Sequence, residues 1–376
     1  MTAQPLAGLR VVELTHMVMG PACGLVLADL GADVIKVEPP AGDNTRRLTG
    51  SGAGFFAAFN RNKRSLAVDL KGEGASIVQA LAGRADILVE NFRPGALDKL
   101  GLGAAALRDA NPRLIYCSLK GFLPGPYEHR TALDEVVQMI GGLAYMTGPP
   151  GQPLRAGSSV IDIMGGTYGA VAILAAVEER HRTGVGAHVQ SALFESVALL
   201  MAQHMAQFAI TGEEPPPMSL RRVAWPIYDI FETADGGQLF VGVVTDTQWQ
   251  VFCDAFGLPA LAADPALTTQ AERVAARPRV LPVVAATLRQ HSRAELAARC
   301  EALGLPFAPI GHPIELLDDP HLTRSGGLVP VTLPGGSMTA LPALPVAFDG
   351  KRPALRHDLP GVGQHTAEIL AELGWA

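Results

Sequence analysis

The amino-acid sequence predicts an α/β protein whose main part is a parallel sheet with helices on both faces. Between residues 10 and 122, short runs rich in β-branched residues alternate with apolar helical patterns, an order typical of parallel strands joined by crossover helices. A longer helical stretch begins at residue 131, and the proline-rich segment at residues 213–222 predicts a domain boundary. The length of 376 residues agrees with two domains, or with one large domain that contains an insertion.

The first elements form a βαβ unit. Residues 10–14 (RVVEL) predict a strand, residues 22–31 an apolar helix, and residues 33–40 a second strand that runs into two prolines. Three more strands and one amphipathic helix follow, at residues 65–70 (strand), 72–84 (helix ended by Gly83), 86–92 (strand) and 113–122 (strand). These nearly continuous apolar strands favour a sheet that is covered on both faces.

The second half of the chain changes character several times. Three helical segments each end at a glycine, at residues 131–148, 165–184 and 191–212. Beyond the prolines at 215–217, residues 227–244 predict a β-hairpin around the turn Ala234-Asp235-Gly236-Gly237. Helical patterns then dominate as far as Leu317, and short strand-like runs lead to a final helix at residues 365–375.

Composition and charge narrow the class of protein. A formal net charge of −6 leaves no long basic face, so neither nucleic acid nor an anionic membrane surface is an expected partner. The four cysteines lie far apart without C-x-x-C spacing, which favours reduced thiols over a metal site or disulfide framework. The opening residues lack a secretory pattern, and no uninterrupted apolar run approaches the roughly 18 residues of a membrane span. We therefore expect a cytoplasmic protein.

Common enzyme motifs are absent from the sequence. The turn after the first strand reads THMVMGPAC and lacks G-x-G-x-x-G, which argues against nicotinamide binding although the second strand ends at Glu38. Neither a P-loop, nor G-x-S-x-G, nor H-E-x-x-H is present. The commonest NTPase, hydrolase and zinc-protease classes are thereby excluded.

Two aspartates and one histidine are candidates for chemistry. Asp162 follows a short β-like run just ahead of a glycine-rich helix start, where it would either cap the helix or serve as an ionised, accessible carboxylate for covalent acyl chemistry. Asp134 stands three residues after Thr131 at the head of a helical pattern, close to a capping box. His16, at the end of the first strand, is either a packed, orienting residue or a proton carrier. The residues alone leave these alternatives open.

Basic residues flank several predicted strand ends in the N-terminal half. In an α/β sheet, ligands bind at the carboxyl ends of strands, where cations suit phosphate groups, whereas a single cation is usually a solvated surface charge. The set consists of Lys63, Arg64, Lys71, Arg93 and Lys99.

Several sequence blocks occur in one order along nearly the whole chain, among them PLAGLRVVELTH, ADILVENFRPGALDKLGLG, ILAAVEERHRTGVGAHV and YDIFETADGGQLFVG. Together they resemble the class III CoA-transferases, the family of formyl-CoA transferase and carnitine CoA-transferase, which also includes α-methylacyl-CoA racemase. The resemblance rests on many blocks and not on one short motif.

This resemblance implies a mechanism and a set of site residues. Asp162 matches the family's catalytic aspartate, which would form an acyl anhydride and then an aspartyl-CoA thioester, with backbone amides near the helix start stabilising the oxyanions. Asp134 and His16 would be auxiliary. Acyl-CoA and a carboxylic acid would be substrates, and neither a tightly bound cofactor nor a metal is implied. CoA would be held by His16, Met17, Val18, Met19, Lys71, Asn91, Phe92, Arg93 and Lys99.

Departures from the family pattern bear on the reaction. Val18 replaces a glutamine and Leu133 a tyrosine of formyl-CoA transferase, which argues against formate and oxalate as substrates. The racemase has a histidine where this chain has Leu133, and leucine cannot titrate, so transfer is favoured and a racemase-like reaction is the alternative. A CoA-binding protein without turnover and a structural dimeric scaffold are two further hypotheses, which Asp162 and the ligand-loop blocks argue against.

The resemblance also implies an assembly and suggests a substrate. Two ring-like chains would interlock as a homodimer, with the active site between the large domain of one chain and the small domain of the other. The apolar Met17-Val18-Met19 run indicates a pocket for an acid larger than formate, and Arg46, Arg47 or Arg130 would bind a second carboxylate, so succinyl-CoA is our hypothesis for the donor. The domains would be residues 1–200 (large, Rossmann-like), 201–225 (linker), 226–325 (small, α+β) and 326–376 (linker and return to the large domain).

Overall fold

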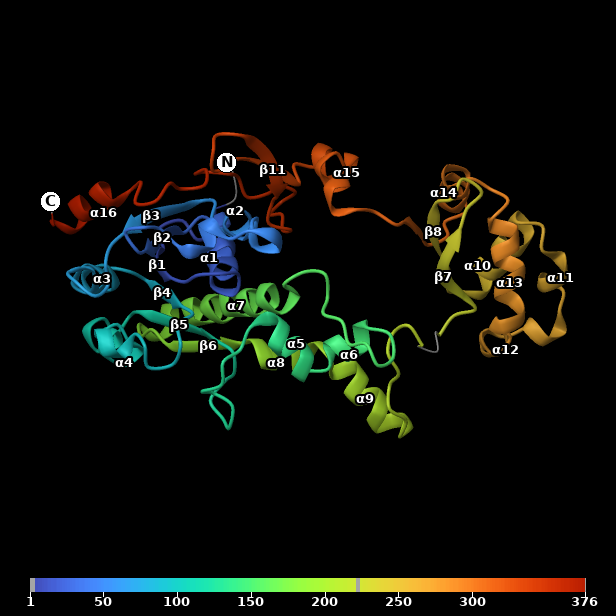
Figure 1. Ribbon diagram of the computed structural model, residues 1–376, viewed down its shortest axis with the longest axis horizontal. Coiled ribbons are helices and arrows are strands. Elements are labelled where there is room, and N and C mark those ends of the chain that lie inside the picture. Colours follow the sequence, from blue (N-terminus) through green and yellow to red (C-terminus); the bar gives the residue numbers. More distant parts are fainter. Residues whose placement is uncertain (1–3, 221–223, 376) are drawn as a thin grey trace. The chain divides into compact units, whose positions relative to one another are not determined.

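The computed structural model describes residues 4–220 and 224–375. The chain divides into a large unit (residues 1–220 and 317–376) and a small unit (residues 221–316), both drawn in Figure 1. The linker expected at residues 201–225 is helical in its first part, where α9 (Ala202–Thr211) lies. Residues 221–223 of that expected linker lie outside the described residues.

A six-stranded parallel sheet with the order β3-β2-β1-β4-β5-β6 forms the centre of the large unit. In β1, Val11 aligns with Val34 of β2 on one side and with Ile87 of β4 on the other. This order is that of doubly wound nucleotide-binding folds, and it confirms the predicted α/β class. The strands are β1 (Arg10–Leu14), β2 (Asp33–Glu38), β3 (Lys63–Ala67), β4 (Ile87–Glu90), β5 (Ile115–Lys120) and β6 (His188–Ala192).

Both faces of the sheet are buried under helices. Successive strand residues point to opposite faces, so Val11 packs with α1, α7 and α8, whereas Val12 packs with α3, α4 and α16. The helices of the large unit are α1 (Met19–Asp29), α2 (Phe55–Phe59), α3 (Gly74–Ala82), α4 (Ala104–Ala110), α5 (Asp134–Ile140), α6 (Leu143–Thr147), α7 (Val160–Thr183), α8 (Leu193–Leu200), α9, α15 (Pro320–Arg324) and α16 (Thr366–Leu373).

The start of α7 differs from the sequence prediction. The predicted β-like run before Asp162 is wrong, because α7 already begins at Val160 with Ser159 as its N-cap residue. Asp162 therefore lies within the first helical turn and does not cap it. Local sequence favoured a strand there because Val and Ile are β-branched, but packing against the sheet makes the segment helical.

Strand β6 was not predicted from the sequence. Its residues, HVQSA, contain only one β-branched side chain, and three of the five are polar. Pairing with β5, in which Tyr116 aligns with His188, places it at the edge of the sheet. An edge strand is defined by its neighbour's backbone more than by its own hydrophobicity, so local pattern is a poor guide to it.

The small unit has its own core around an antiparallel sheet, β7-β8-β9. The predicted hairpin is present, with Ile227 opposite Val243. Trp249 and Phe252 of α10 are buried in this core. The elements are β7 (Ile227–Glu232), β8 (Gln238–Val243), α10 (Asp246–Ala255), α11 (Pro259–Ala262), α12 (Gln270–Ala275), α13 (Arg277–Leu288), α14 (Arg293–Ala302) and β9 (Phe307–Pro309).

After the small unit the chain returns to the large unit, forms the hairpin β10 (Leu328–Thr332) and β11 (Met338–Pro342), and ends with α16 beside β3 (Figure 1). Arg64 of β3 connects this helix to the sheet, because its guanidinium forms ion pairs with Glu368 at 3.0 Å and Glu372 at 2.7 Å. Arg64 also pairs with Asp33 of β2. The predicted closing helix is therefore part of the sheet's cover.

Helix α7 has the length and mean hydropathy (1.8) of a membrane span. It nevertheless packs against α1, β5 and β6, and its buried side includes Ile161 and Ile173. A core helix of a globular domain meets the same length and hydropathy criteria, and the packing of α7 is of that kind.

Candidate active site

The carboxyl ends of β1 and β4 meet where the strand order of the sheet reverses, which is the usual ligand position in this class of fold. His16 follows β1 and Asn91 follows β4. The Asn91 side chain donates to the His16 carbonyl at 2.9 Å and accepts from the His16 N–H at 3.1 Å. Phe92 packs edge-on against the His16 ring. The structure thus brings together three of the residues predicted to hold CoA.

A cavity of about 750 Å³ opens at this edge of the sheet. His16, Met17, Lys71 and Phe92 line it, and the Lys71 ammonium forms no ion pair with any described residue. Partial burial lowers the pKa of the His16 ring below its ordinary value, so the ring is neutral at neutral pH. Lys71 is therefore the cation that this cavity offers to an anionic ligand.

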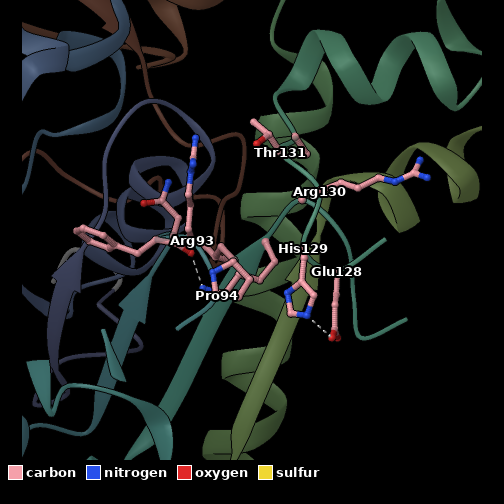
Figure 2. Close-up of a pocket in the computed structure, with 12 residues that line it drawn as sticks. Arg93, Pro94, Glu128, His129, Arg130 and Thr131 are labelled. Atoms are coloured by element: carbon pink, nitrogen blue, oxygen red, sulfur yellow. Dashed lines mark hydrogen bonds and ion pairs between the residues drawn. The ribbon is translucent and has the colours of Figure 1, made fainter. Parts of the chain in front are cut away.

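A second pocket, of about 280 Å³, lies between β4, β5 and the loop at residues 121–132 (Figure 2). Arg93 lines one side of it and Thr131 the other, while the Arg130 side chain extends away from it. Lys120 contributes no free charge here, because it pairs with Glu90 at 2.6 Å. Arg93 forms no ion pair with the described residues and remains available to a ligand.

Several residues of the predicted CoA set do not present side chains to these cavities. Val18 and Met19 are buried, at 1% and 5% exposure, in the core around the start of α1. Lys99 is exposed in a short 3-10 helix, and its neighbour Leu100 lines the larger cavity. Only the backbone of Val18 and Met19 can take part in binding.

Two of the basic residues that were expected to face phosphates are structural. Lys63 is fully buried, with its ammonium 2.8 Å from Glu13, and Arg64 is committed to Asp33 and α16. Both stand at the beginning of β3, which is the opposite end of the strand from the ligand edge. The expectation that they bind a ligand is therefore wrong.

Asp134 has a different role from the one its own helix suggested. It does not form the predicted capping box with Thr131, and α5 begins at Asp134 itself. Its carboxylate instead caps α7, accepting hydrogen bonds from the backbone N–H of Ile161 at 2.9 Å and of Asp162 at 3.2 Å. One carboxylate thus satisfies two of the free amides at the start of α7.

Two side chains that sequence analysis missed complete the surroundings of Asp134. Gln138 donates to Asp134 Oδ1 at 2.5 Å, and the Arg155 guanidinium lies 3.2 Å from the same oxygen. The four-residue spacing of Asp134 and Gln138 on one helix was a usable signal. Arg155 lies in an irregular loop, and no sequence pattern pointed to its contact with Asp134.

The Asp162 carboxylate, by contrast, accepts no hydrogen bond and forms no ion pair within the described part of the chain. It is partly exposed at the first turn of α7. Burial, followed by the nearby negative charge of Asp134, raises the pKa of Asp162 to about 7, while Arg155 opposes the shift. A carboxylate without partners, close to its ionisation midpoint at neutral pH, is suited to act as a nucleophile.

The Asp162 turn is tied to the β1–α1 loop by close helix packing. A Cβ added to Gly166 would lie 2.5 Å from the Met19 carbonyl oxygen, so only glycine allows α1 and α7 to approach this closely. Ser191 of β6 donates to the Gly165 carbonyl at 2.8 Å. The position of the nucleophile candidate is therefore coupled to the loop that bears His16 and Met17.

Comparison with known proteins shows the family of the chain. The model of a family described as CoA-transferase family III matches residues 6–366. A succinate–glutarate CoA-transferase of Agrobacterium fabrum is 35% identical, over 98% of this chain and 96% of that protein. A succinyl-CoA:mesaconate CoA-transferase of Haloarcula hispanica is 34% identical over the same shares. The crystal structure of a CAIB/BAIF family protein from Brucella suis has a TM-score of 0.86 and 34% identity, covering 99% of this chain and 100% of that one.

The doubly wound sheet, its ligand edge and these matches define an enzyme that acts on acyl-CoA. The chain belongs to CoA-transferase family III, the CaiB/BaiF family, and is a CoA-transferase. The family predicted from the sequence blocks is thereby confirmed.

Proposed function

We propose that this enzyme moves CoA from succinyl-CoA to a second dicarboxylic acid, with Asp162 as the nucleophile. The observation that carries the proposal is the contrast between two neighbouring aspartates. Asp134 is saturated with donors, whereas Asp162 is unpaired and its pKa is raised to about 7. One carboxylate holds the helix, and the other is left for chemistry.

The reaction is balanced without ATP. An Asp162 carboxylate oxygen attacks the thioester carbonyl of succinyl-CoA, the C–S bond breaks, and a mixed anhydride and CoA thiolate form. The thiolate then attacks the aspartyl carbonyl, releasing succinate and leaving CoA as a thioester on Asp162. The acceptor carboxylate attacks this thioester, and the same two steps run in reverse to give the new acyl-CoA and free Asp162.

The amides of the second and third residues of α7 are not available as the oxyanion site that the family resemblance implied. The N–H groups of Ile161 and Asp162 already donate to Asp134. The dipole of the 24-residue helix still favours negative charge at this end. Donors to the oxyanions would therefore be groups other than these two amides.

Acyl-CoA is proposed to lie along the carboxyl edge of the sheet, in the larger cavity. His16, Met17, Asn91 and Phe92 would form its wall. The unpaired cations Lys71, Arg93 and Lys99 would meet the phosphates, because charge-assisted contacts to phosphate are the strongest that such side chains make. The exposure of all three cations supports this assignment.

The acceptor class follows from the relatives and from the cations. Both relatives described above are named for succinate or succinyl-CoA together with another dicarboxylate. Of the three arginines considered for the second carboxylate, Arg46 is neutralised by Glu38 at 2.7 Å, and Arg47 donates to Ala41 and Asn44. Arg130 stacks on the Tyr127 ring and has no acidic partner among the described residues. We favour Arg130 for this contact, which would lie outside the smaller pocket because the side chain extends away from it (Figure 2).

A racemase-like reaction is less well supported. It requires two titrating groups that exchange a proton with the α-carbon. Leu133 offers none, and the Asp134 carboxylate is engaged by Gln138, Arg155 and two amides. Deuterium incorporation at the α-carbon without acid exchange would support it over transfer.

We propose in addition the interlocked homodimer of the resembled family. Helix α9 exposes large apolar side chains, which a second copy of the chain would cover. They include Met205, Phe208 and Ile210, at 65%, 53% and 84% exposure. Light scattering after size exclusion tests this directly. A monomer at micromolar concentration would contradict it.

The experiment that tests the function uses the full chain with succinyl-CoA and, separately, glutarate, mesaconate or acetate. New acyl-CoA is measured by liquid chromatography and mass spectrometry, and the intact protein is examined for a CoA adduct mapped to Asp162. Asp162→Asn should lose both adduct and transfer. Glu178→Gln, a change on the exposed face of the same helix, is the matched control. Turnover of acetate but of neither dicarboxylate would contradict the substrate class.

A further inference from the structure

The loop between β1 and α1 contains a strained residue. Met17 has a φ of 62°, a left-handed conformation that side chains other than glycine rarely adopt. Such strain persists only where the surroundings impose it, and it clusters at ligand sites. Met17 lines the larger cavity beside His16. Something in the structure must therefore hold this loop.

The backbone is held on both sides of His16. Before it, the Thr15 carbonyl accepts a hydrogen bond from the Lys36 ammonium at 2.9 Å. After it, the Met17 N–H donates to the Thr45 hydroxyl at 3.1 Å. The two bonds fix the peptide groups on either side of His16. The second of these peptides is also the one from which the φ of Met17 turns. On the far side of Met17 the chain enters α1, where the buried Val18 accepts a hydrogen bond from the Ala22 N–H at 2.8 Å.

Both hydrogen bonds come from one group of buried residues, which we call the Lys36 cluster (Lys36, Asp43 and Thr45). Asp43 Oδ2 lies 2.9 Å from the Lys36 ammonium, and Asp43 Oδ1 accepts from the Thr45 N–H at 2.9 Å. The three residues are 0%, 5% and 2% exposed. Lys36 thus acts on Thr15 directly and on Met17 through Asp43 and Thr45.

The cluster is electrically balanced within the core. Glu13 lies between two ammonium groups, 2.8 Å from Lys63 and 3.8 Å from Lys36, so two cations face Glu13 and Asp43. Buried charges are tolerated when they are paired in good geometry, and removing one partner is costly. The Lys36 ammonium is enclosed and directed at backbone, so it does not bind a phosphate.

We propose that Lys36, Asp43 and Thr45 are positioning residues that hold the Met17 backbone in its left-handed conformation and thereby shape the wall that receives acyl-CoA. This inference rests on the proposed function in one respect, the placement of acyl-CoA in this cavity. Binding to a preformed wall avoids the cost of ordering a loop when the ligand arrives.

Thr45→Val tests the inference most cleanly, because it removes the hydroxyl acceptor with little change of volume and leaves the buried ion pairs in place. Thr45→Ser keeps the hydroxyl and is the matched control. Calorimetry with desulfo-CoA, a CoA analogue that cannot react, gives the Kd; steady-state assays give KM for succinyl-CoA and kcat; thermal unfolding reports on folding; and crystal structures report the φ of Met17.

For Thr45→Val we expect Kd and KM to rise about tenfold, a change of about 1.4 kcal/mol in binding, with kcat within roughly threefold of wild type and Met17 at negative φ. Thr45→Ser should restore both constants to within roughly twofold. A folded Thr45→Val protein that keeps the left-handed Met17 overturns the inference, even if affinity falls, because Thr45 would then act by touching the ligand. Wild-type protein that binds no desulfo-CoA would overturn the placement of acyl-CoA instead, and the φ of Met17 in Thr45→Val would still decide whether the cluster holds the loop.

Discussion

The carboxylate of Asp134 accepts a hydrogen bond from the backbone N–H of Asp162 at 3.2 Å, so one aspartate anchors the helical turn that carries the other. The two residues are 28 positions apart in the sequence and belong to different helices, α5 and α7. Their proximity also couples their charges, because the Asp134 carboxylate is one cause of the raised pKa of Asp162. Structure and reactivity are thereby linked through a single contact.

The first prediction concerns the pH dependence of catalysis. If ionised Asp162 is the nucleophile, kcat/KM of the free enzyme should rise with pH as one proton is lost around pH 7. Dicarboxylate substrates have pKa values of about 4–5, like ordinary carboxyl groups, so their titration falls well below this limb. A pH profile at constant ionic strength measures it. A rate independent of pH between about 5.5 and 8.5 would contradict the assignment.

Asp134→Asn should move that limb to lower pH. The substitution removes a neighbouring negative charge that disfavours ionisation of Asp162, so the pKa of Asp162 falls. It also weakens the cap of α7 and the Arg155 contact, and the free energy of unfolding should drop by about 1–2 kcal/mol. Glu135→Gln, an exposed neighbour, is the control. An unmoved limb in a folded Asp134→Asn protein would show that the two charges are not coupled.

Asp162→Asn should stabilise the fold at alkaline pH while it abolishes transfer. A carboxyl whose pKa is raised from 3.8 to about 7 holds its proton more tightly in the folded state, so its contribution to stability is lost as pH rises from about 4 to 7. Asparagine does not ionise, so the Asp162→Asn variant does not lose this stability as pH rises. Its advantage in the free energy of unfolding should be near zero at pH 4, grow through that interval and level off above pH 7. The full pKa difference corresponds to about 4 kcal/mol, and solvent screening of the partly exposed carboxylate reduces the expected advantage to about 2 kcal/mol.

Urea titrations at pH 4.5, 6 and 8 measure this difference. Asp162→Ala is a useful companion, because it also removes the charge but leaves a smaller side chain. An Asp162→Asn protein that is less stable than wild type at pH 8 would indicate that the carboxylate is an ordinary structural group.

Arg93→Gln and Lys99→Gln should each raise KM for succinyl-CoA about three- to tenfold with little change in kcat. Both side chains are exposed and lack acidic partners among the described residues, so their loss removes attraction for phosphate and little else. The effect should shrink as salt is raised, because exposed charges are screened. Arg182→Gln, 74% exposed at the end of α7, is the control. If the Arg93 and Lys99 variants had the same KM as the Arg182 control, these two cations would not contact the phosphates.

Gly166→Ala should lower the free energy of unfolding by about 1–3 kcal/mol, although alanine is the better helix former. The added methyl would meet the Met19 carbonyl oxygen at 2.5 Å and push α1 away from α7. Val171→Ala, on an exposed position of the same helix, is the comparison. Chemical denaturation measures both, and a Gly166→Ala protein as stable as wild type would show that the helix pair can separate at no cost.

The class of fold and the family could both be predicted from the order of residues along the chain. Strands such as Arg10–Leu14 and Ile87–Glu90 are short apolar runs between turn signals, and their pattern is readable because backbone pairing and burial act on consecutive residues. The ordered sequence blocks also identified Asp162 as the residue to examine. Strand patterns and sequence blocks both depend on residues that are neighbours in the chain, so they can be recognised without the structure.

Which charged groups are free to meet a ligand could not be predicted and depends on how the chain folds. Lys63 and Arg64 looked like ligand cations but are enclosed in ion pairs at the wrong end of β3, and Asp134 caps α7 and not its own helix. Each outcome depends on partners tens or hundreds of residues away, such as Glu372 for Arg64. A buried charge takes whichever partner packing brings within hydrogen-bond distance, because desolvation makes an unpaired charge costly, and no local pattern specifies that partner.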